Sequence, residues 1–348
     1  MTIQTRKTVN DWTEYELSKG KMSVNLLNYG ATITKIITPD QKGNLENIVL
    51  TYKDYNIYKE NPFYLGSIIG GVAGRIANAQ FEIDGKTYNV EKNDGKNHLH
   101  GGSNGLHKQL WHGEPFEKTE SCGVKFTTSI SEEVDGYPGN LDVTVTYSLT
   151  NQNELIIDYQ AETDQARPVV LTNHTYFNLI GDAKGTLHNH EVKFSSDKML
   201  ELDDELIPTG KIIDIKGTTF DFNHGRKLSG GLCSKDRQHQ IAGYGYDHYF
   251  IFNETPSKVL VSEKSSGRKL MIETDQPGMV LYSGNNLDSG IDLLEVDSHS
   301  SGKYLGVCFE TQTHPVTLNH SGLKLPSVIV KPGERYQHRT RFRFGVKC

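Results

Sequence analysis

The feature that most constrains this chain is a series of short runs rich in β-branched and aromatic residues, each bounded by Gly, Asn, Asp or Pro. Clear examples are residues 143–149 (VTVTYSL), 155–159 (LIIDY), 259–262 and 269–273. Residues 150–153 (TNQN) separate the first two runs and predict a hairpin loop. No segment shows helical periodicity over three or more turns. The sequence therefore predicts an all-β fold, a large antiparallel β-sandwich with little helix.

The domain organisation follows from length and from the spread of turn residues. The chain has 348 residues, and all-β domains often exceed about 200 residues as one unit. Pro and Gly are scattered rather than clustered, and we find neither a low-complexity tract nor a repeat of fixed period. We therefore expect a single β-sandwich domain over residues 1–348, with long functional loops.

Charge and hydropathy exclude several classes of protein. The net charge is −6, without the basic stripe that nucleic-acid binding requires, and an acidic chain suits a neutral ligand better than a polyanion. No apolar run reaches the roughly 18 residues of a membrane span, and the first residues lack the apolar core of a signal peptide. The four cysteines, at 122, 233, 308 and 348, form no CxxC pattern. We expect a reduced, cytoplasmic protein without nucleic-acid or membrane partners.

Two histidine pairs raise the question of a metal. His98 and His100 are two residues apart, as are His188 and His190, so on a strand each pair would lie on one face. A metal site would need a further His or carboxylate and supporting hydrogen bonds. The alternative is that both pairs are ordinary polar loop residues. We favour that alternative and predict no metal and no other cofactor.

One histidine and one carboxylate lie within apolar surroundings. His174 stands between an apolar run, residues 169–171, and Tyr176. Alone, this pattern is typical of a core histidine. Glu310 follows residues 306–309 (GVCF), which predict a buried strand. Carboxylates are rarely buried unless they are paired, and a partly buried one is suited to act as a base; a structural salt bridge is the alternative.

Three further signals are weak by themselves. Asp247 follows Gly and Tyr and could cap a turn. Arg75 could pair with a surface acid. The Gly-rich residues 66–74 lack the lysine of a phosphate-binding loop, and no βαβ pattern surrounds them, so we reject nucleotide binding. The absence of a Gly-x-Ser-x-Gly motif leaves a serine hydrolase without support.

Taken together and in this order, ten short motifs resemble the aldose 1-epimerase, or galactose mutarotase, family over nearly the whole chain. Each motif is weak alone, and their common order makes the resemblance specific. They are NYGATIT (28–34), AGRI (73–76), NHLHGG (97–102), GYPGNL (136–141), LTNHTYFNL (171–179), PTG (208–210), TTFDF (218–222), GYDH (245–248), PG (277–278) with Tyr282, and FETQ (309–312).

The resemblance implies a galactose mutarotase-like sandwich that interconverts the α and β anomers of a free hexose in a cleft, as a monomer or homodimer. Matched motif by motif, the catalytic base falls on Glu310 and the acid on His174. We expect a protonated His174 beside an ionised Glu310 to stabilise both charges. The positions implied to bind or border the sugar are Arg75, His100, Asp247, Gln312 and Tyr176.

The chain departs from the family pattern at several positions. A second arginine and an asparagine common in the family are replaced by Gly71 and Gly74, the usual Gln and Phe by Val280 and Leu281, and a Pro-Asp pair by the segment 313–317 (THPVT). We expect these changes to border the cleft and to affect substrate preference.

Three other functions stay open. A hexose-6-phosphate epimerase on the same fold would need an Arg and Lys clamp, and the loss of arginine at Gly71 argues against it. A non-catalytic sugar-binding or sensing module need not keep both Glu310 and His174. A glycosidase would need two carboxylates, which Asp247 and Glu310 could supply.

Overall fold

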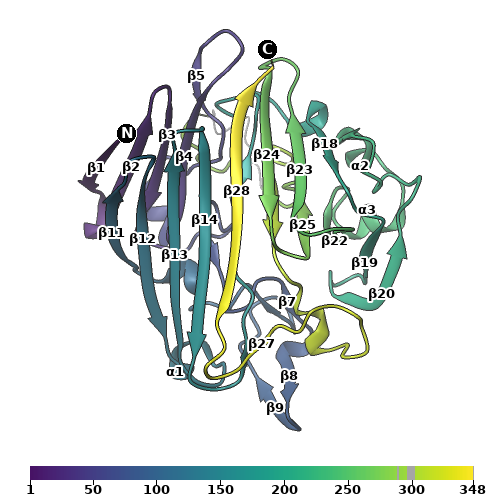
Figure 1. Cartoon of the computed structure of the whole chain (residues 1–348). Coiled ribbons are helices and arrows are strands. Elements are labelled where there is room, and N and C mark those ends of the chain that lie inside the picture. The colour runs from purple at the N-terminus through teal and green to yellow at the C-terminus, as the bar shows by residue number, and fades with distance from the viewer. Residues whose placement is uncertain (288–289, 296–301, 348) are drawn as a thin grey trace.

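The longest strands lie side by side in one antiparallel sheet at the front of the molecule (Figure 1). The computed structural model describes residues 1–287, 290–295 and 302–347. Along β13, buried residues alternate with more exposed ones, as in a sheet covered on one face. Within the described residues this sheet has nine strands, in the order β11 (His112–Glu117), β12 (Ser121–Ile130), β13 (Leu141–Thr150), β14 (Glu154–Thr163), β28 (Tyr336–Val346), β24 (Arg268–Thr274), β23 (Ser257–Ser262), β18 (Glu191–Phe194) and β21 (Arg226–Lys227).

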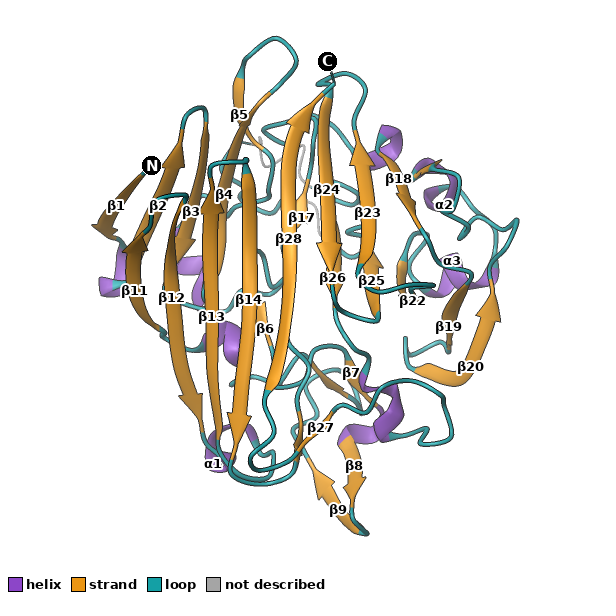
Figure 2. Ribbon diagram, in the orientation of Figure 1, coloured by secondary structure: helices purple, strands orange, loops and turns teal. Residues whose placement is uncertain are grey.

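Two smaller antiparallel sheets lie behind the front sheet (Figure 2). One contains β1 (Thr2–Lys7), β2 (Thr13–Lys19), β3 (Met22–Leu27), β4 (Thr32–Pro39) and β5 (Leu45–Asn47), in that order. The other has the order β17 (Tyr176–Phe177), β26 (Val307–Thr311), β25 (Gly278–Tyr282), β22 (Asp247–Ile251), β19 (Lys198–Leu202) and β20 (Pro208–Asp214).

A common apolar core joins the three sheets into a sandwich. Val24 of β3, Val145 of β13 and Phe309 of β26 belong to one buried cluster, and each is at most 2% exposed. Burying such side chains is the main favourable contribution to folding. The predicted antiparallel β-sandwich is confirmed. So is the hairpin at residues 150–153, because β13 and β14 pair directly across it.

Short elements connect the sheets, and helix is scarce, as predicted. Among the described residues no α-helix exceeds five residues, and none is long and apolar enough to cross a membrane. The remaining strands pair as β10 (His98–Leu99) with β7 (Arg75–Ile76), β15 (Arg167–Pro168) with β27 (Ile329–Val330), β16 (Thr172–Asn173) with β6 (Ile68–Ile69), and β8 (Gln80–Ile83) with β9 (Lys86–Asn89). The helices are α1 (Glu132–Asp135), α2 (Ser229–Leu232) and α3 (Arg237–Ile241), with 3₁₀ turns η1 (Val9–Asp11), η2 (Tyr55–Lys59), η3 (Ala77–Ala79), η4 (Leu106–Lys108), η5 (Leu187–Asn189) and η7 (Pro315–Leu318).

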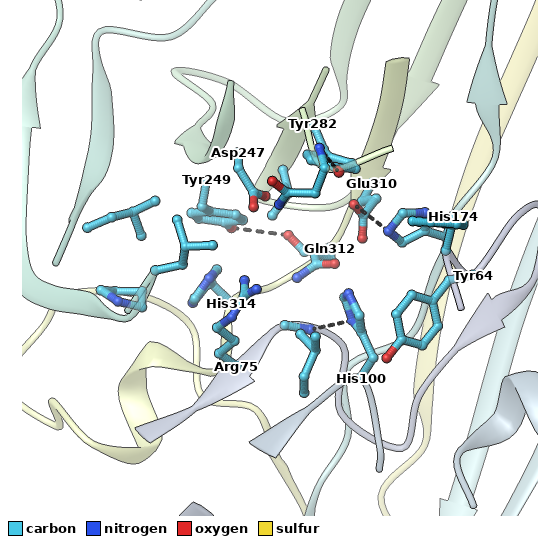
Figure 3. A pocket seen from close by; sticks show the side chains of 18 of the residues that line it. Tyr64, Arg75, His100, His174, Asp247, Tyr249, Tyr282, Glu310, Gln312 and His314 are labelled. Atoms are coloured by element: carbon cyan, nitrogen blue, oxygen red, sulfur yellow. Dashed lines mark hydrogen bonds and ion pairs between the residues drawn. The ribbon is translucent and has the colours of Figure 1, made fainter. Parts of the chain in front are cut away.

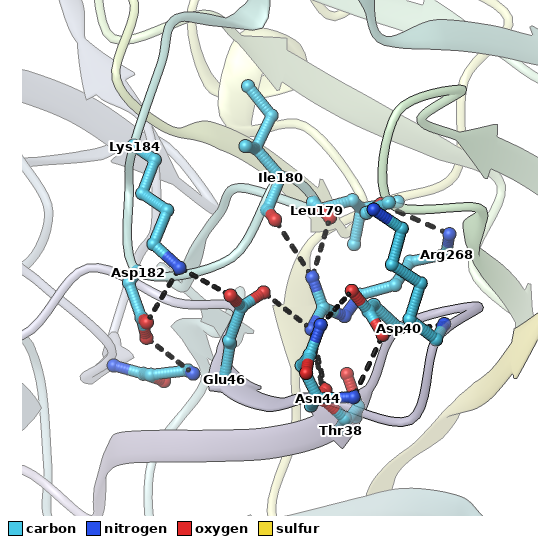
Figure 4. Close-up of polar contacts among 12 residues, drawn as sticks. Thr38, Asp40, Asn44, Glu46, Leu179, Ile180, Asp182, Lys184 and Arg268 are labelled. Atoms are coloured by element: carbon cyan, nitrogen blue, oxygen red, sulfur yellow. Dashed lines mark hydrogen bonds and ion pairs between the residues drawn. The ribbon is translucent and has the colours of Figure 1, made fainter.

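A buried arginine ties the front sheet to the back layer (Figure 4). Arg268 begins β24, and its side chain is 2% exposed. Its guanidinium donates to Glu46 Oε2 at 2.8 Å and to the carbonyl oxygens of Thr38, Leu179 and Ile180 at 2.8–3.3 Å. Glu46 also pairs with a lysine, Lys184. Charge-assisted hydrogen bonds of this kind are stronger than neutral ones, so Arg268 fixes β4, β24 and the segment after β17 relative to one another.

Candidate active site

The predicted site residues line one pocket, to which the six-stranded sheet contributes Asp247 of β22 and Glu310 of β26 (Figure 3). The pocket has a volume of about 210 Å³. Its wall includes every residue that the sequence analysis assigned to catalysis or sugar contact: Arg75, His100, His174, Tyr176, Asp247, Glu310 and Gln312. These residues come from five different elements or the loops next to them, so only the folded chain brings them together.

Strand β26 supplies the floor of the pocket through the alternation of its side chains. Val307 and Phe309 belong to the common core, whereas Glu310 faces the pocket. Val280, which lies opposite Glu310 in β25, lines the pocket as well. All five residues of β26 are buried, which explains why the carboxylate stands within an apolar run of the sequence.

His174 is held by its backbone against the Gly-rich segment. The N–H of Gly66 donates to the carbonyl of His174 at 3.0 Å, and the N–H of His174 donates to the carbonyl of Ser67 at 2.9 Å. Gly66 has φ +70°, and a Cβ there would overlap the carbonyl oxygen of Ile33. Only glycine fits this position without strain. The Gly-rich segment therefore positions a histidine and does not form a phosphate loop.

His174 and Glu310 face each other in the pocket. Nε2 of His174 lies 3.5 Å from Oε1 of Glu310, and the two side chains are 5% and 4% exposed. They come from the loop after β16 and from β26, segments 136 residues apart in sequence. An imidazole and a carboxyl group therefore stand together in one small, buried volume.

Burial shifts the pKa values of His174 and Glu310 in opposite directions. Burial raises the pKa of the Glu310 carboxyl well above its usual range; the charge of Asp247 adds to this effect, and that of Arg75 opposes it. Burial lowers the pKa of His174 to about 4. Both shifts disfavour the charged forms. The expectation that the pair stabilises both its charges is wrong, because desolvation is the largest effect on the pKa of each group and disfavours its charged form.

His100 and Arg75 approach the pair from the opposite side. The backbone N–H of Gly74 donates to Nδ1 of His100 at 3.1 Å. Burial lowers the pKa of His100 well below its usual value. The neutral ring therefore carries its proton on Nε2, because Nδ1 is the acceptor. The Nε of Arg75 pairs with Asp94 Oδ2 at 2.7 Å, which fixes the guanidinium at the pocket wall.

The paired histidines of the sequence do not stay together. His100 has φ +55° and leaves the strand that ends at Leu99, so His98 and His100 do not share a face. Nδ1 of His98 bonds to the carbonyl of Glu91 at 2.7 Å. In the second pair, Nε2 of His190 accepts from a backbone N–H at 2.9 Å, whereas His188 contacts a threonine hydroxyl. Neither pair forms a metal site.

The remaining predicted residues add hydrogen-bonding groups. Asp247 begins β22 opposite Tyr282, and burial raises the pKa of its carboxyl. Gln312 follows β26 and is fully buried, yet neither its Oε1 nor its Nε2 has a partner among the described residues. Buried amides without partners are rare in proteins. The side chain therefore offers one donor and one acceptor to a ligand. Tyr176 packs against the His174 ring, with centroids 5.0 Å apart.

Sequence reasoning missed four aromatic groups of the wall: Phe63, Tyr64, Tyr249 and Tyr282. Tyr64 packs against both His100 and His174. It lies in a loop with φ +57°, where no periodic pattern could reveal it. Tyr249 could have been found, because it stands two residues after Asp247 on one strand and so shares its face.

The departures from the family pattern do not all border the pocket. Gly74, Val280 and His314 line it, as expected. Leu281 is fully buried in the common core. A Cβ on Gly71 would lie 3.1 Å from Nη2 of Arg167, which belongs to a buried ion pair outside the pocket. The expectation is therefore wrong for Gly71 and Leu281, and the missing arginine at Gly71 says nothing about phosphate binding.

One group in the pocket has the composition of a metal site. The ligand atoms of His100, His174 and Glu310 all lie within 4.8 Å of one another. Ligand atoms of one tetrahedral zinc ion lie about 3.4 Å apart. The contact of 3.5 Å between Nε2 of His174 and Oε1 of Glu310 suits an acid–base pair equally well.

Comparisons with known proteins identify the family of this chain. The family model for aldose 1-epimerase matches residues 13–343. Galactose mutarotase from Homo sapiens is 37% identical over 336 residues, covering 96% of this chain and 94% of its own length. Aldose 1-epimerase from Escherichia coli is 32% identical, with coverages of 93% and 92%. The crystal structure of galactose 1-epimerase from Lactobacillus acidophilus has a TM-score of 0.86 and 29% identity, with both chains fully covered. The chain therefore belongs to the aldose 1-epimerase family of sugar isomerases.

Proposed function

We propose that this protein interconverts the α and β anomers of free hexoses such as galactose or glucose, with Glu310 as the base and His174 as the acid. One observation carries the proposal: a carboxyl and an imidazole lie 3.5 Å apart, buried, in a pocket with further polar groups. Membership of the aldose 1-epimerase family supports the same reaction. A cytoplasmic location and a monomeric or homodimeric state stay predictions from the sequence.

The reaction needs two proton transfers. The Glu310 carboxylate takes the proton of the C1 hydroxyl while Nε2 of His174 gives a proton to the ring oxygen. The bond from C1 to the ring oxygen breaks, and C1 becomes an aldehyde carbon. Rotation about C1–C2 presents the other face of the aldehyde, and the reverse transfers close the ring. Each positioned acid or base typically contributes about 10²–10⁴-fold in rate.

The pKa shifts favour the forward transfers. Because burial raises the pKa of Glu310, its carboxylate is a stronger base than one in water. Because burial lowers the pKa of His174 to about 4, its imidazolium is a stronger acid. The transfers leave an uncharged carboxyl and an uncharged imidazole, the forms that the buried pocket favours. The pocket thus stabilises the state that accompanies the open sugar.

Neighbouring side chains would hold the sugar for these transfers. Nε2–H of His100 and the guanidinium of Arg75 can donate to sugar oxygens, and Asp247 can accept from hydroxyls. The unpartnered amide of Gln312 can do both. Fixing the substrate next to the acid and base lowers the entropic barrier to proton transfer.

Polarimetry tests the proposal directly. Freshly dissolved α-galactose or α-glucose should reach its equilibrium rotation faster with catalytic amounts of protein than with buffer alone. A matched sample of Glu310→Gln protein controls for buffer catalysis. Rates equal to buffer for both sugars and for other aldoses would rule the proposal out.

We expect the reaction to need no metal. The proposed transfers involve only protons, and no step in them uses a metal ion. Exhaustive EDTA treatment should therefore leave the mutarotation rate unchanged within about twofold. A loss of activity that one divalent metal restores would contradict this prediction and would return His100 to the list of metal ligands.

We expect neutral hexoses to be preferred over hexose 6-phosphates. Among the described residues of the pocket wall, Arg75 is the one Arg or Lys, and it is already paired with Asp94. The wall also carries the carboxyls of Asp247 and Glu310, which offer a phosphate no positive charge. Because an unpaired charge is costly to bury, kcat/KM should be at least about 10-fold higher for glucose than for glucose 6-phosphate. Coupled assays that consume only the β anomer of each sugar measure the ratio, and the opposite order would indicate a sugar-phosphate epimerase.

A further inference from the structure

The imidazole of His174 lies between two side chains of the same strand. Cys308 and Glu310 are two residues apart in β26, so both point toward the ring. Sγ of Cys308 lies 3.4 Å from Nδ1, and Oε1 of Glu310 lies 3.5 Å from Nε2. Each ring nitrogen therefore has its own neighbour. The proposed mechanism uses the Nε2 side and leaves the contact with Cys308 without a role.

The number of protons on the His174 ring suggests a role for its contact with Cys308. An imidazolium carries N–H groups at both nitrogens. When Nε2 gives its proton to the sugar, the remaining proton stays on Nδ1, and a buried N–H needs an acceptor. Among the described residues, Cys308 is the one side chain within hydrogen-bond distance of Nδ1. Its sulfur is thus the side-chain acceptor available in the state that follows proton transfer.

We propose that Cys308 is a positioning residue whose sulfur accepts the hydrogen bond of His174 Nδ1–H and so reserves Nε2 for proton exchange with the substrate. This proposal rests on the proposed role of His174 as the acid. It assigns no covalent or redox chemistry to the cysteine, whose sulfur stays a thiol throughout.

A neutral thiol is well suited to this position. Burial raises the pKa of the Cys308 thiol well above its usual range, so the group stays uncharged. A carboxylate at Nδ1 would stabilise the imidazolium and weaken it as an acid, whereas a thiol is a weak acceptor. Sulfur therefore orients the ring without making the proton harder to release. The other titratable groups around the ring are Tyr64, His100, Tyr176, Tyr282 and Glu310.

His100 provides an internal reference within the same pocket. Its Nδ1 accepts from a backbone N–H, so its neutral ring must carry the proton on Nε2. His174 should carry its proton on Nδ1. The two rings, with centroids 5.5 Å apart, are thus expected to be opposite tautomers.

The first experiment measures kinetics for Cys308→Ala and Cys308→Ser. The alanine variant leaves a buried N–H without an acceptor, and kcat should fall about 5- to 100-fold with KM changed less than about threefold. Serine restores an acceptor, so kcat should recover to within about fivefold of the native value. Oxygen accepts a hydrogen bond more strongly than sulfur, so serine should stabilise the His174 imidazolium and raise its pKa. The limb of the kcat/KM profile that reports this pKa should therefore move to higher pH in Cys308→Ser.

Cys122→Ala is the matched control. Cys122 is also a fully buried thiol, but it belongs to β12 and to the common core. Its loss should lower stability without changing kcat or the pH profile. A Cys308→Ala protein with native kcat and an unchanged pH profile would overturn the proposal.

The second experiment needs no variant of Cys308 and no enzyme activity. Long-range ¹H–¹⁵N correlation spectra of histidine-labelled native protein at pH 7 distinguish the two tautomers, and His174→Asn and His100→Asn variants assign the signals. We expect the Nδ1–H form for His174 and the Nε2–H form for His100. A neutral His174 with its proton on Nε2 would overturn the proposal even if mutarotation is confirmed. Normal turnover by Glu310→Gln would instead refute the proposed role of Glu310 as the base and leave the tautomer result standing.

Discussion

Glu310→Gln should lower kcat for mutarotation by about 10²–10⁴-fold, the usual contribution of a general base. Glutamine keeps the size and hydrogen-bonding capacity of the side chain but cannot take the C1 proton. Sugar affinity should change far less, because the amide can still contact the hydroxyl. Polarimetry gives kcat, and isothermal titration of the sugar into the variant gives the affinity. A large change in kcat with a small change in affinity would assign Glu310 to catalysis and not to binding.

A matched control is Glu263→Gln. Glu263 is also a buried glutamate, 3% exposed, but it binds the backbone N–H groups of Ser265 and Ser266 outside the pocket. Its loss should reduce stability and leave kcat within a few-fold. Near-normal turnover in a well-folded Glu310→Gln protein would remove Glu310 from the mechanism.

The proton donor should behave in the same way. His174→Asn should lower kcat to a similar extent, and the double variant with Glu310→Gln should lose less than the product of the two effects, because the groups act as a unit. Full multiplicativity would mean that the 3.5 Å contact between their side chains has no catalytic consequence.

Arg268→Met should lower the free energy of unfolding by about 3–5 kcal/mol, the usual cost of removing one partner of a buried ion pair. Methionine fills similar volume but leaves Glu46 Oε2 and the carbonyls of Thr38, Leu179 and Ile180 without their donor. Urea denaturation followed by tryptophan fluorescence measures the change.

Arg339→Met provides the contrast. Arg339 pairs with Asp158 at 2.6 Å, but the two side chains are 56% and 29% exposed. Exposed pairs contribute about 0–1 kcal/mol, so this variant should unfold close to the native midpoint. An equal decrease in the free energy of unfolding in the two variants would show that burial does not determine how much the Arg268–Glu46 pair stabilises the fold.

The strands and hairpins could be predicted from the sequence because the patterns that indicate them are local. The alternation in residues 143–149 and the turn at 150–153 are contained within one hairpin, so they predict β13 and β14 directly. The sheet order was not accessible. Nothing local to residues 336–346 indicates that they pair with both β14 and β24.

The site was only partly accessible for the same reason. Glu310 stood out because a charge interrupts a buried run, but its approach to His174 across 136 residues came from resemblance to a family. The expectation that His98 and His100 share a strand face was wrong, because the strand ends at Leu99 and His100 has φ +55°. The prediction that Gly71 borders the cleft was wrong, because Arg167, a residue distant in sequence, packs beside it.

The position of β28 has a consequence for how the protein is made. This strand lies between β14 and β24, so residues near the end of the chain join the two halves of the nine-stranded sheet. During synthesis this segment emerges after both halves, because it follows β14 and β24 in the sequence. The front layer can close only once β28 has been made, and each half exposes an unpaired strand edge until then. Closure requires pairing across almost 200 residues, and such long-range contacts form slowly. The time between translation and closure is therefore the period in which the nascent chain most needs protection from aggregation.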